Sequence, residues 1–270
     1  MADLTLRSSP LHPEGGPIRL RYHTTGEGPP VVLLHGGWGE GAYPWDAAAA
    51  ALAAEHRVYA VDRAGYGGSD DVPDLPDGFH RAMAEETLAA LDALGLGEVA
   101  LWGHSDGAVV ATWTALLAPR RVRALVLEAA HFFAAKNGSL PFFRDAVEAP
   151  ERFGPDVVAA LEREHGARWR EVMARGGRAW LRIIARGLAG GSDLYEGRLG
   201  EIAAPTLLLH GRRDPRTEPG ELAALQRALP AARLALVDAG HSPHTSARAG
   251  AEAIAAAVSF LRETWAAETR

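Results

Sequence analysis

The 270-residue sequence contains no cysteine, which excludes disulfide bonds, thiolate catalysis and cysteine-based metal sites. It also lacks any apolar run near the roughly 18 residues of a membrane span. The first thirteen residues include Asp3 and Arg7 and form no stretch typical of a signal peptide, so we expect a cytoplasmic protein with no membrane partner. The net charge of −6 comes from acidic and basic residues mixed along the chain, which leaves no basic stripe and disfavours a nucleic-acid partner.

The composition is that of an ordinary globular protein, with 47% hydrophobic and 23% charged residues. Apolar, β-rich runs alternate with alanine and leucine stretches at helical spacing, and this rhythm predicts an α/β fold: a mostly parallel, doubly wound β-sheet. Runs such as Val31-Val32-Leu33-Leu34 have no polar side and indicate strands covered on both faces. Helices are expected over 79–94 and 254–265. The predicted strands are Ile18–Tyr22, Val31–His35, Val58–Val61, Val99–Trp102, Val122–Leu127, Thr206–His210 and Arg233–Val237.

One stretch interrupts the alternation of strands and helices. Between His131 and about Ala203 no strand is predicted, whereas 151–164 and 167–188 have helical spacing. We interpret this stretch as a helical cap inserted into the sheet domain. The expected organisation is a first core segment over 1–130, a cap over 131–203 and a second core segment over 204–270.

The segment Gly103-His104-Ser105-Asp106-Gly107 has the pattern G-x-S-x-G between a predicted strand and an apolar helix, the context in which this pattern forms a nucleophile elbow. A sharp turn would hold Ser105 exposed at a helix N-terminus, and glycines two residues to either side would avoid collisions with neighbouring backbone. Ser105 is therefore the predicted nucleophile.

A nucleophilic serine needs oxyanion donors, a base and an acid. The glycine-rich loop His35-Gly36-Gly37-Trp38-Gly39 follows a strand, so we expect one donor from Gly37 or Trp38 and the second from the backbone N–H of Asp106. Asp214 and His241 follow the last two predicted strands, in the chain order serine, aspartate, histidine. His241 is the predicted general base, and Asp214 is predicted to orient it.

Other assignments of the acid and base were weighed. Glu128, directly after a strand, is the rival for the acid, and His244 is the rival for the base. We favour Asp214 on motif context and expect His244 to cap or pack. A metal site built from His241 and His244 would lack a third ligand, so no metal and no cofactor are predicted.

Together these motifs resemble the α/β-hydrolase superfamily over nearly the whole chain. The resemblance includes the segment 62–69, Asp-Arg-Ala-Gly-Tyr-Gly-Gly-Ser, which is similar to a packing turn of that family, and the pairs Gly211/Asp214 and Gly240/His241. It implies the α/β-hydrolase fold and a serine hydrolase with an acyl-enzyme. Haloalkane dehalogenases and epoxide hydrolases resemble the same fold but have an aspartate nucleophile where this chain has Ser105.

Within the superfamily, Ser105-Asp106-Gly107 resembles the valacyclovirase-like branch, which includes amino-acid ester hydrolases. That resemblance implies that Asp106 binds a substrate amino group; alternatively, its side chain turns aside and bonds to the loop. Ala108 departs from the branch, where a further glycine is common. The cap aromatics 132, 133, 142, 143, 169 and 180 are candidates for a pocket lining, of which we expect two or three to face substrate. The predicted substrate-binding residues are Asp106, Glu128, Phe132, Trp169 and Trp180.

The predicted reaction is hydrolysis of a small-molecule carboxylic ester, and the resemblance to the valacyclovirase-like branch implies an amino-acid ester. Two alternatives stay open at this point. Carbon–carbon bond hydrolases use the same triad types, and a binding protein could occupy the same fold. The oligomeric state and the natural substrate are not predicted.

Overall fold

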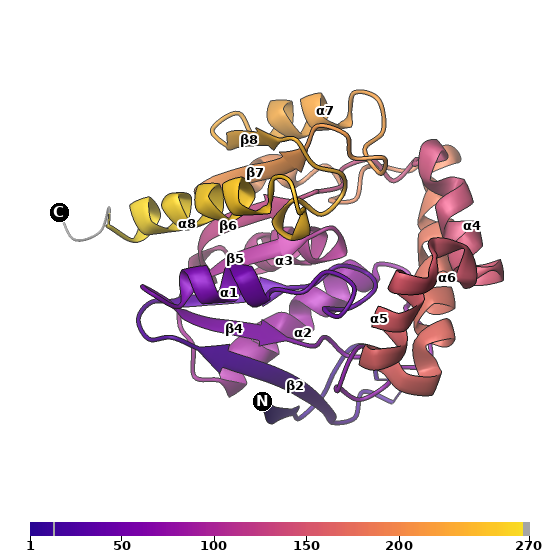
Figure 1. The fold of residues 1–270 in the computed structure, drawn as a ribbon, viewed down its shortest axis with the longest axis horizontal. Helices are drawn as coiled ribbons and strands as arrows, with labels where there is room; N and C mark the ends of the chain where they lie inside the picture. The colour runs from indigo at the N-terminus through magenta and orange to yellow at the C-terminus, as the bar shows by residue number, and fades with distance from the viewer. Residues whose placement is uncertain (13, 267–270) are drawn as a thin grey trace.

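The computed structural model describes residues 1–12 and 14–266, and one eight-stranded sheet runs through its centre (Figure 1). The strand order is β1-β2-β4-β3-β5-β6-β7-β8, with antiparallel pairing for β1/β2 and β2/β4 and parallel pairing across the rest. The predicted mostly parallel sheet is therefore confirmed. The strands are β1 (Ala2–Leu6), β2 (Ile18–Thr25), β3 (Pro30–Leu34), β4 (Arg57–Val61), β5 (Val99–His104), β6 (Val122–Glu128), β7 (Thr206–Gly211) and β8 (Arg233–Val237).

All seven predicted strands are present, and β8 has the predicted bounds. The sequence prediction missed β1, a five-residue edge strand in which only Leu4 and Leu6 are buried. It is short and pairs with β2 alone. The strongest hydrophobic patterns in the chain belong to central strands, so this edge strand was the hardest to recognise.

Helices cover both faces of the sheet (Figure 1). α1 (Asp46–Leu52) and α8 (Gly250–Ala266) pack on one face, whereas α2 (Phe79–Ala93), α3 (Asp106–Leu117) and α7 (Glu221–Ala228) pack on the other. The side chains of β3 alternate between the two cores, since Val31 and Leu33 join the first and Val32 and Leu34 the second. This two-sided burial explains why β3 reads as an unbroken apolar run.

Three helices lie between β6 and β7 and are called the cap helices: α4 (Leu140–Glu148), α5 (Pro155–His165) and α6 (Trp169–Leu188). Figure 1 shows them grouped at one end of the sheet. The helix predicted over 151–164 is interrupted at Gly154, whose φ of 94° is reached at low cost by glycine alone, and α5 starts directly after it. No helix among the described residues has the length and apolar character needed to cross a membrane.

The end of α5 is hydrogen-bonded to the loop after β3. Glu164 accepts the backbone N–H groups of Glu40 and Gly41 at 2.7 and 2.6 Å, and His165 bonds to the Trp38 carbonyl at 2.9 Å. Gly39 has a φ of 88°, and a Cβ there would lie 2.3 Å from the Glu164 carboxylate. The glycine-rich loop is therefore shaped to receive a carboxyl group from the cap helices.

This contact predicts a pH-dependent stability. Burial raises the pKa of Glu164 to about 8, and the nearby Asp62 and Glu40 carboxylates act in the same direction. Between its ordinary pKa of 4.5 and about 8, the folded chain therefore binds more protons at this site than the unfolded chain. The free energy of unfolding should fall as pH rises through this window, by about 1 kcal/mol per pH unit.

Urea denaturation of the wild type and Glu164→Gln at pH 5, 6, 7 and 8 measures this slope. We expect the amide variant to lose most of it, and Glu162→Gln, an exposed position of α5, to keep it. Identical slopes in the wild type and Glu164→Gln would show that Glu164 stays ionised across the range.

Candidate active site

Ser105 lies at the turn between β5 and α3, with φ 54° and ψ −117°, a conformation that a non-glycine residue rarely adopts. A Cβ at Gly103 would lie 2.2 Å from the Gly107 carbonyl oxygen, and one at Gly107 would lie 2.0 Å from the Leu34 carbonyl oxygen. Both glycines are thus required for the turn to pass between β3 and α3. The predicted collisions are confirmed, and the strained turn presents the serine hydroxyl at the start of a helix.

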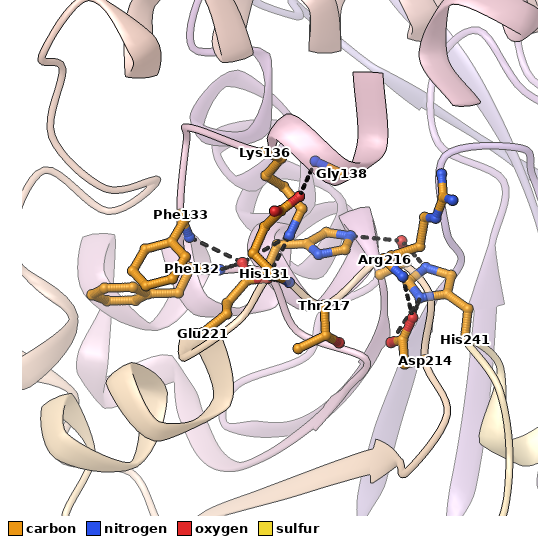
Figure 2. A network of polar contacts seen from close by, with 12 residues as sticks. His131, Phe132, Phe133, Lys136, Gly138, Asp214, Arg216, Thr217, Glu221 and His241 are labelled. Atoms are coloured by element: carbon orange, nitrogen blue, oxygen red, sulfur yellow. Dashed lines mark hydrogen bonds and ion pairs between the residues drawn. The ribbon is translucent and has the colours of Figure 1, made fainter. Parts of the chain in front are cut away.

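Asp214 and His241 reach this serine from the loops after β7 and β8. The His241 Nε2 lies 2.9 Å from the Ser105 Oγ, and the His241 Nδ1 lies 2.9 and 3.0 Å from the two Asp214 oxygens. Figure 2 shows the Asp214 carboxylate and the His241 ring in contact. The structure therefore brings the three predicted residues together in the order that proton transfer from serine to histidine requires.

The environment of Asp214 keeps its carboxylate ionised. Burial alone would raise its pKa, but the adjacent His241, the N–H of Arg216 and His210 hold the pKa below the ordinary range. The Arg216 N–H donates to Oδ1 at 2.8 Å, and the carboxylate is 1% exposed. A buried, ionised carboxylate in this position fixes the proton of His241 on Nδ1 and leaves Nε2 as the acceptor for serine.

Glu128, the other candidate for the acid, bonds to Trp102 and His244. It accepts hydrogen bonds from the Trp102 indole at 2.9 Å and from the His244 backbone and Nδ1 at 2.9 and 2.7 Å. The carboxylate is fully buried, and although burial opposes it, the His244 ring lowers its pKa to about 2. Glu128 therefore holds the segment after His241 in place, and the expectation that His244 packs agrees with this contact.

A second imidazole lies beside the serine. The His131 Nε2 is 3.3 Å from the Ser105 Oγ, and its ring is stacked on the His241 ring at a centroid distance of 5.5 Å. The hydroxyl has one proton to donate, so when His241 accepts it, His131 can only donate its own N–H to the oxygen. Burial, together with Lys136 and His241, keeps the pKa of His131 well below its ordinary value. His131 is thus a neutral donor to the Ser105 hydroxyl.

The loop after β3 and the start of α3 border the serine, as the predicted oxyanion hole requires. Gly37, Trp38 and Asp106 all line the cavity at Ser105. The first N–H groups of a helix have no intrahelical acceptor, so the Asp106 N–H is available to an oxyanion. Which of Gly37 and Trp38 supplies the other donor stays a prediction.

The cavity above Ser105 is small, with about 40 Å³ open to the centre of a water molecule. Phe142, Phe143 and Trp180 of the cap helices line it, and the prediction that two or three aromatics face substrate stays a prediction. Asp106 lines it as well, together with the histidines 104, 131 and 241 and the small residues Ala146, Gly176 and Gly177.

Three of the predicted substrate-binding residues lie elsewhere and are corrected. Glu128 is sequestered by Trp102 and His244, as described above. Phe132 packs on the sheet core near Tyr195, and Trp169 is buried in a cluster with Leu161 and Met173. Each aromatic fills a hydrophobic core, which is the commoner fate of such a side chain. Position in the cap sequence did not distinguish core from cavity.

Asp106 is held by two side chains that the sequence did not connect to it. Its Oδ1 is 3.1 Å from the His80 Nε2 and 2.9 Å from the Trp180 Nε1. Burial would raise its pKa, but His80 and the other donors lower it. Asp106 is therefore an ionised carboxylate with one oxygen bonded inside the protein, and its second oxygen faces Gly37.

Two further residues at the cavity were missed by the sequence prediction. Tyr43 and Arg216 line it from the loops after β3 and β7. Arg216 follows the predicted acid by two positions in a loop at the carboxyl edge of the sheet, where α/β folds bind ligands, and this position was an available signal. Tyr43 has no comparable signal.

A buried ion pair joins the start of the cap segment to the end of the loop that carries Asp214 (Figure 2). Lys136, the single lysine of the chain, lies 2.8 and 2.6 Å from the two Glu221 oxygens, and both side chains are 0% exposed. Glu221 also accepts the backbone N–H groups of residues 132, 133 and 218. Glu221 thereby connects the segment after β6 to the segment between Asp214 and α7.

Comparison with known proteins is consistent with this architecture and shows its family. Residues 29–190 match the family model described as alpha/beta hydrolase fold. The chain belongs to this α/β-hydrolase family. It is 31% identical over 252 residues to a pimeloyl-[acyl-carrier protein] methyl ester esterase of Nitrosomonas europaea, covering 84% of this chain and 94% of that protein. It is also 31% identical over 252 residues to a putative carbamate hydrolase of Azorhizobium caulinodans, covering 84% and 89%.

Solved α/β-hydrolase structures have the same fold. An esterase of Thermogutta terrifontis, determined with malate bound, superposes with a TM-score of 0.71 at 25% identity over 98% of this chain and 99% of that one. A meta-cleavage product hydrolase of Pseudomonas fluorescens superposes with a TM-score of 0.72 at 22% identity over 96% of this chain and 97% of that one. This chain is thus an α/β-hydrolase, and the proteins similar to it include esterases.

Proposed function

We propose that this α/β-hydrolase cleaves a small carboxylic ester by two-step acyl transfer through Ser105. The observation that carries the proposal is the continuous line of contacts from the Ser105 Oγ to His241 and then to Asp214. The similarity to a methyl ester esterase over most of both chains supports an ester as the substrate class. No cofactor and no metal take part in this mechanism.

In the first step, the Ser105 Oγ attacks the ester carbonyl while its proton passes to the His241 Nε2. The N–H of Asp106 and a donor from Gly37 or Trp38 stabilise the charge on the carbonyl oxygen. His241 returns the proton to the leaving alcohol, and the acyl group stays on Ser105. His241 then takes a proton from water, and the resulting attack releases the carboxylic acid and restores the serine.

The amino-acid ester version of this proposal depends on Asp106. Its carboxylate is ionised and lines the cavity, which suits a substrate ammonium group. His80 and Trp180 bond Oδ1, so only Oδ2 could accept a hydrogen bond from such a group. Membership of the valacyclovirase-like branch therefore stays a prediction. It depends on whether the Asp106 Oδ2 atom binds a substrate ammonium group.

The test is pre-steady-state hydrolysis of p-nitrophenyl butyrate. We expect a burst of about one equivalent of nitrophenol and an acyl adduct on Ser105 in the intact mass, because an acyl-enzyme accumulates when its hydrolysis is slow. A parallel assay compares alanine methyl ester with its N-acetyl form. If Asp106 binds the amine, Asp106→Asn removes the preference for the free amine and spares the acetylated ester.

The alternatives give different results in this assay. A binding protein on this fold would be stabilised by ligands but would form no adduct on Ser105. A carbon–carbon bond hydrolase would leave both ester types unreacted and would cleave a vinylogous diketone in a Ser105-dependent manner. Either result would replace the ester proposal.

A further inference from the structure

Arg216 is a charged group in the cavity without a polar partner for its side chain. Its Nη1 atom is buried and makes no hydrogen bond. Within residues 1–12 and 14–266, no carboxylate lies within 4.0 Å of its guanidinium. Figure 2 shows the side chain extending from the Asp214 loop with no contact drawn at the guanidinium. Among the described residues the guanidinium therefore has no hydrogen-bonding partner, and the charges of Asp214 and Glu218 act on it only from a longer distance.

The nearby carboxylates are already engaged. Asp214 bonds His241 and the Arg216 backbone, and the Glu218 Oε1 accepts the Gly138 N–H at 2.9 Å. Other buried arginines of the chain are bonded in a different way. The Arg63 Nη2 donates to the carbonyls of residues 35 and 36, and the Arg175 Nη2 donates to the carbonyl of residue 65. Arg216 differs from both because its guanidinium lies against an aromatic ring.

That partner positions the guanidinium. The Arg216 Cζ lies 3.8 Å from the centre of the Phe142 ring, and Phe142 is itself stacked on Trp38. Burial lowers the pKa of Arg216, although arginine remains charged at neutral pH. A planar guanidinium stacked on a ring keeps its edge available for two parallel hydrogen bonds, the geometry that matches a carboxylate.

The other charge in the cavity is compensated within the protein. Asp106 is bonded by His80 and Trp180, whereas Arg216 has no such donor or acceptor. Arg216 is partly buried, and a ligand of opposite charge that bonds its Nη1 atom would offset the cost of that burial. The side of the cavity at Arg216 therefore suits an anion beside an apolar chain.

We propose that Arg216 is the substrate carboxylate-binding residue, and that the preferred substrate is an ester carrying a second, free carboxylate. This inference rests on the proposed ester hydrolysis and names its substrate class. The free carboxylate would bond to the Arg216 guanidinium while the ester carbonyl lies at Ser105. Arg216 would then select the substrate without taking part in bond cleavage.

The test compares esters that differ only at the far end of the acyl chain. The anionic set is the monoethyl esters of succinic, glutaric and adipic acids, and the neutral set is ethyl butanoate, pentanoate and hexanoate. Ethyl 6-aminohexanoate is the cationic member. For at least one chain length we expect the wild type to have a kcat/KM about 10- to 100-fold higher for the anionic ester, the range of a charge-assisted hydrogen bond.

Variants then assign this preference to a residue. Arg216→Gln should remove it by lowering kcat/KM about 10- to 100-fold more for the anionic ester than for the neutral ester, and Arg216→Lys should restore part of it. Arg212→Gln, an exposed arginine of the same loop, is the matched control and should behave as the wild type. Equal rates on both ester sets in the wild type, an equal loss on both in Arg216→Gln, or a preference for the cationic ester would overturn the proposal.

A binding experiment separates this proposal from the catalytic one. Calorimetric titration of the Ser105→Ala variant with monoethyl adipate and with ethyl hexanoate needs no turnover, and only the first ligand carries a free carboxylate. We expect monoethyl adipate to bind about 10-fold more tightly, and the difference to vanish in Ser105→Ala/Arg216→Gln. If no ester is cleaved and monoethyl adipate still binds through Arg216, ester hydrolysis fails and the carboxylate site stands; if esters are cleaved and monoethyl adipate shows no advantage, the reverse holds.

Discussion

Replacing Ser105 with alanine is expected to lower kcat for p-nitrophenyl butyrate by about 10⁶-fold, and Asp214→Asn by about 10⁴-fold. The serine variant loses the attacking atom. The asparagine variant keeps the shape of the loop, but its amide can present an N–H to the His241 Nδ1 and so move the imidazole proton to Nε2. His241 could then no longer accept the proton of Ser105, which lies 2.9 Å away.

Glu128→Gln is the matched control for the identity of the acid. Glu128 contacts Trp102 and His244, and no contact joins it to His241. We expect its kcat to stay within about threefold of the wild type, with a stability loss of about 1 to 3 kcal/mol from the weakened buried hydrogen bonds. Steady-state kinetics with a circular dichroism check of folding measures both effects. A kcat loss in Glu128→Gln as large as that of Asp214→Asn would transfer the role of the acid to Glu128.

Lys136→Met is expected to lower the free energy of unfolding by about 3 to 5 kcal/mol, the range for breaking a buried ion pair. Both partners of the pair are 0% exposed, so removal of the ammonium leaves the Glu221 carboxylate buried without a counter-charge. Glu221 would retain the N–H donors of residues 132, 133 and 218, which only partly compensate.

A double-mutant cycle isolates this interaction. Adding Glu221→Gln to Lys136→Met removes the uncompensated charge and keeps one acceptor, so the double variant should be more stable than Lys136→Met alone. Arg198→Met breaks the exposed pair with Glu201 and should cost less than about 1 kcal/mol. Urea denaturation measures the wild type, the single variants Lys136→Met and Glu221→Gln, the double variant and Arg198→Met. A loss below about 1 kcal/mol in Lys136→Met would show that water or a rearranged Glu221 replaces the ammonium.

The sheet and the nucleophile elbow could be predicted because their signals are local. The apolar run of β3 results from burial on both faces of the sheet, and the glycines around Ser105 are required because other backbone lies close to the turn. Both patterns are visible in residues that are adjacent in the sequence. The break at Gly154 was missed because helical spacing continues across it, although its positive φ ends one helix before the next begins. Gly154 shows that a periodic pattern locates a helix more securely than it locates the helix ends.

The surroundings of the candidate site depend on contacts between residues distant in sequence. His80 reaches Asp106 from α2, and His131 reaches Ser105 from the segment after β6. Nothing in the neighbouring sequence of either histidine indicates its partner. Glu128 was a reasonable candidate for the same reason, since the sequence places it at the end of a strand, as it does Asp214. The strand order puts β7 beside β8, so the loop after β7 is the one that reaches His241.

The position of the single lysine gives the folded chain an unusual chemical property. Twenty-seven of the twenty-eight basic residues counted as lysine or arginine are arginine, and the remaining one, Lys136, is fully buried. Reagents that acylate side-chain amines, and a protease that cuts only after lysine, therefore meet no accessible lysine side chain while the fold is intact. Cleavage after Lys136 would require the surrounding region to open, and it would separate the strands before the cap helices from those after them. The cleavage rate would therefore report how often that region opens, without any added label.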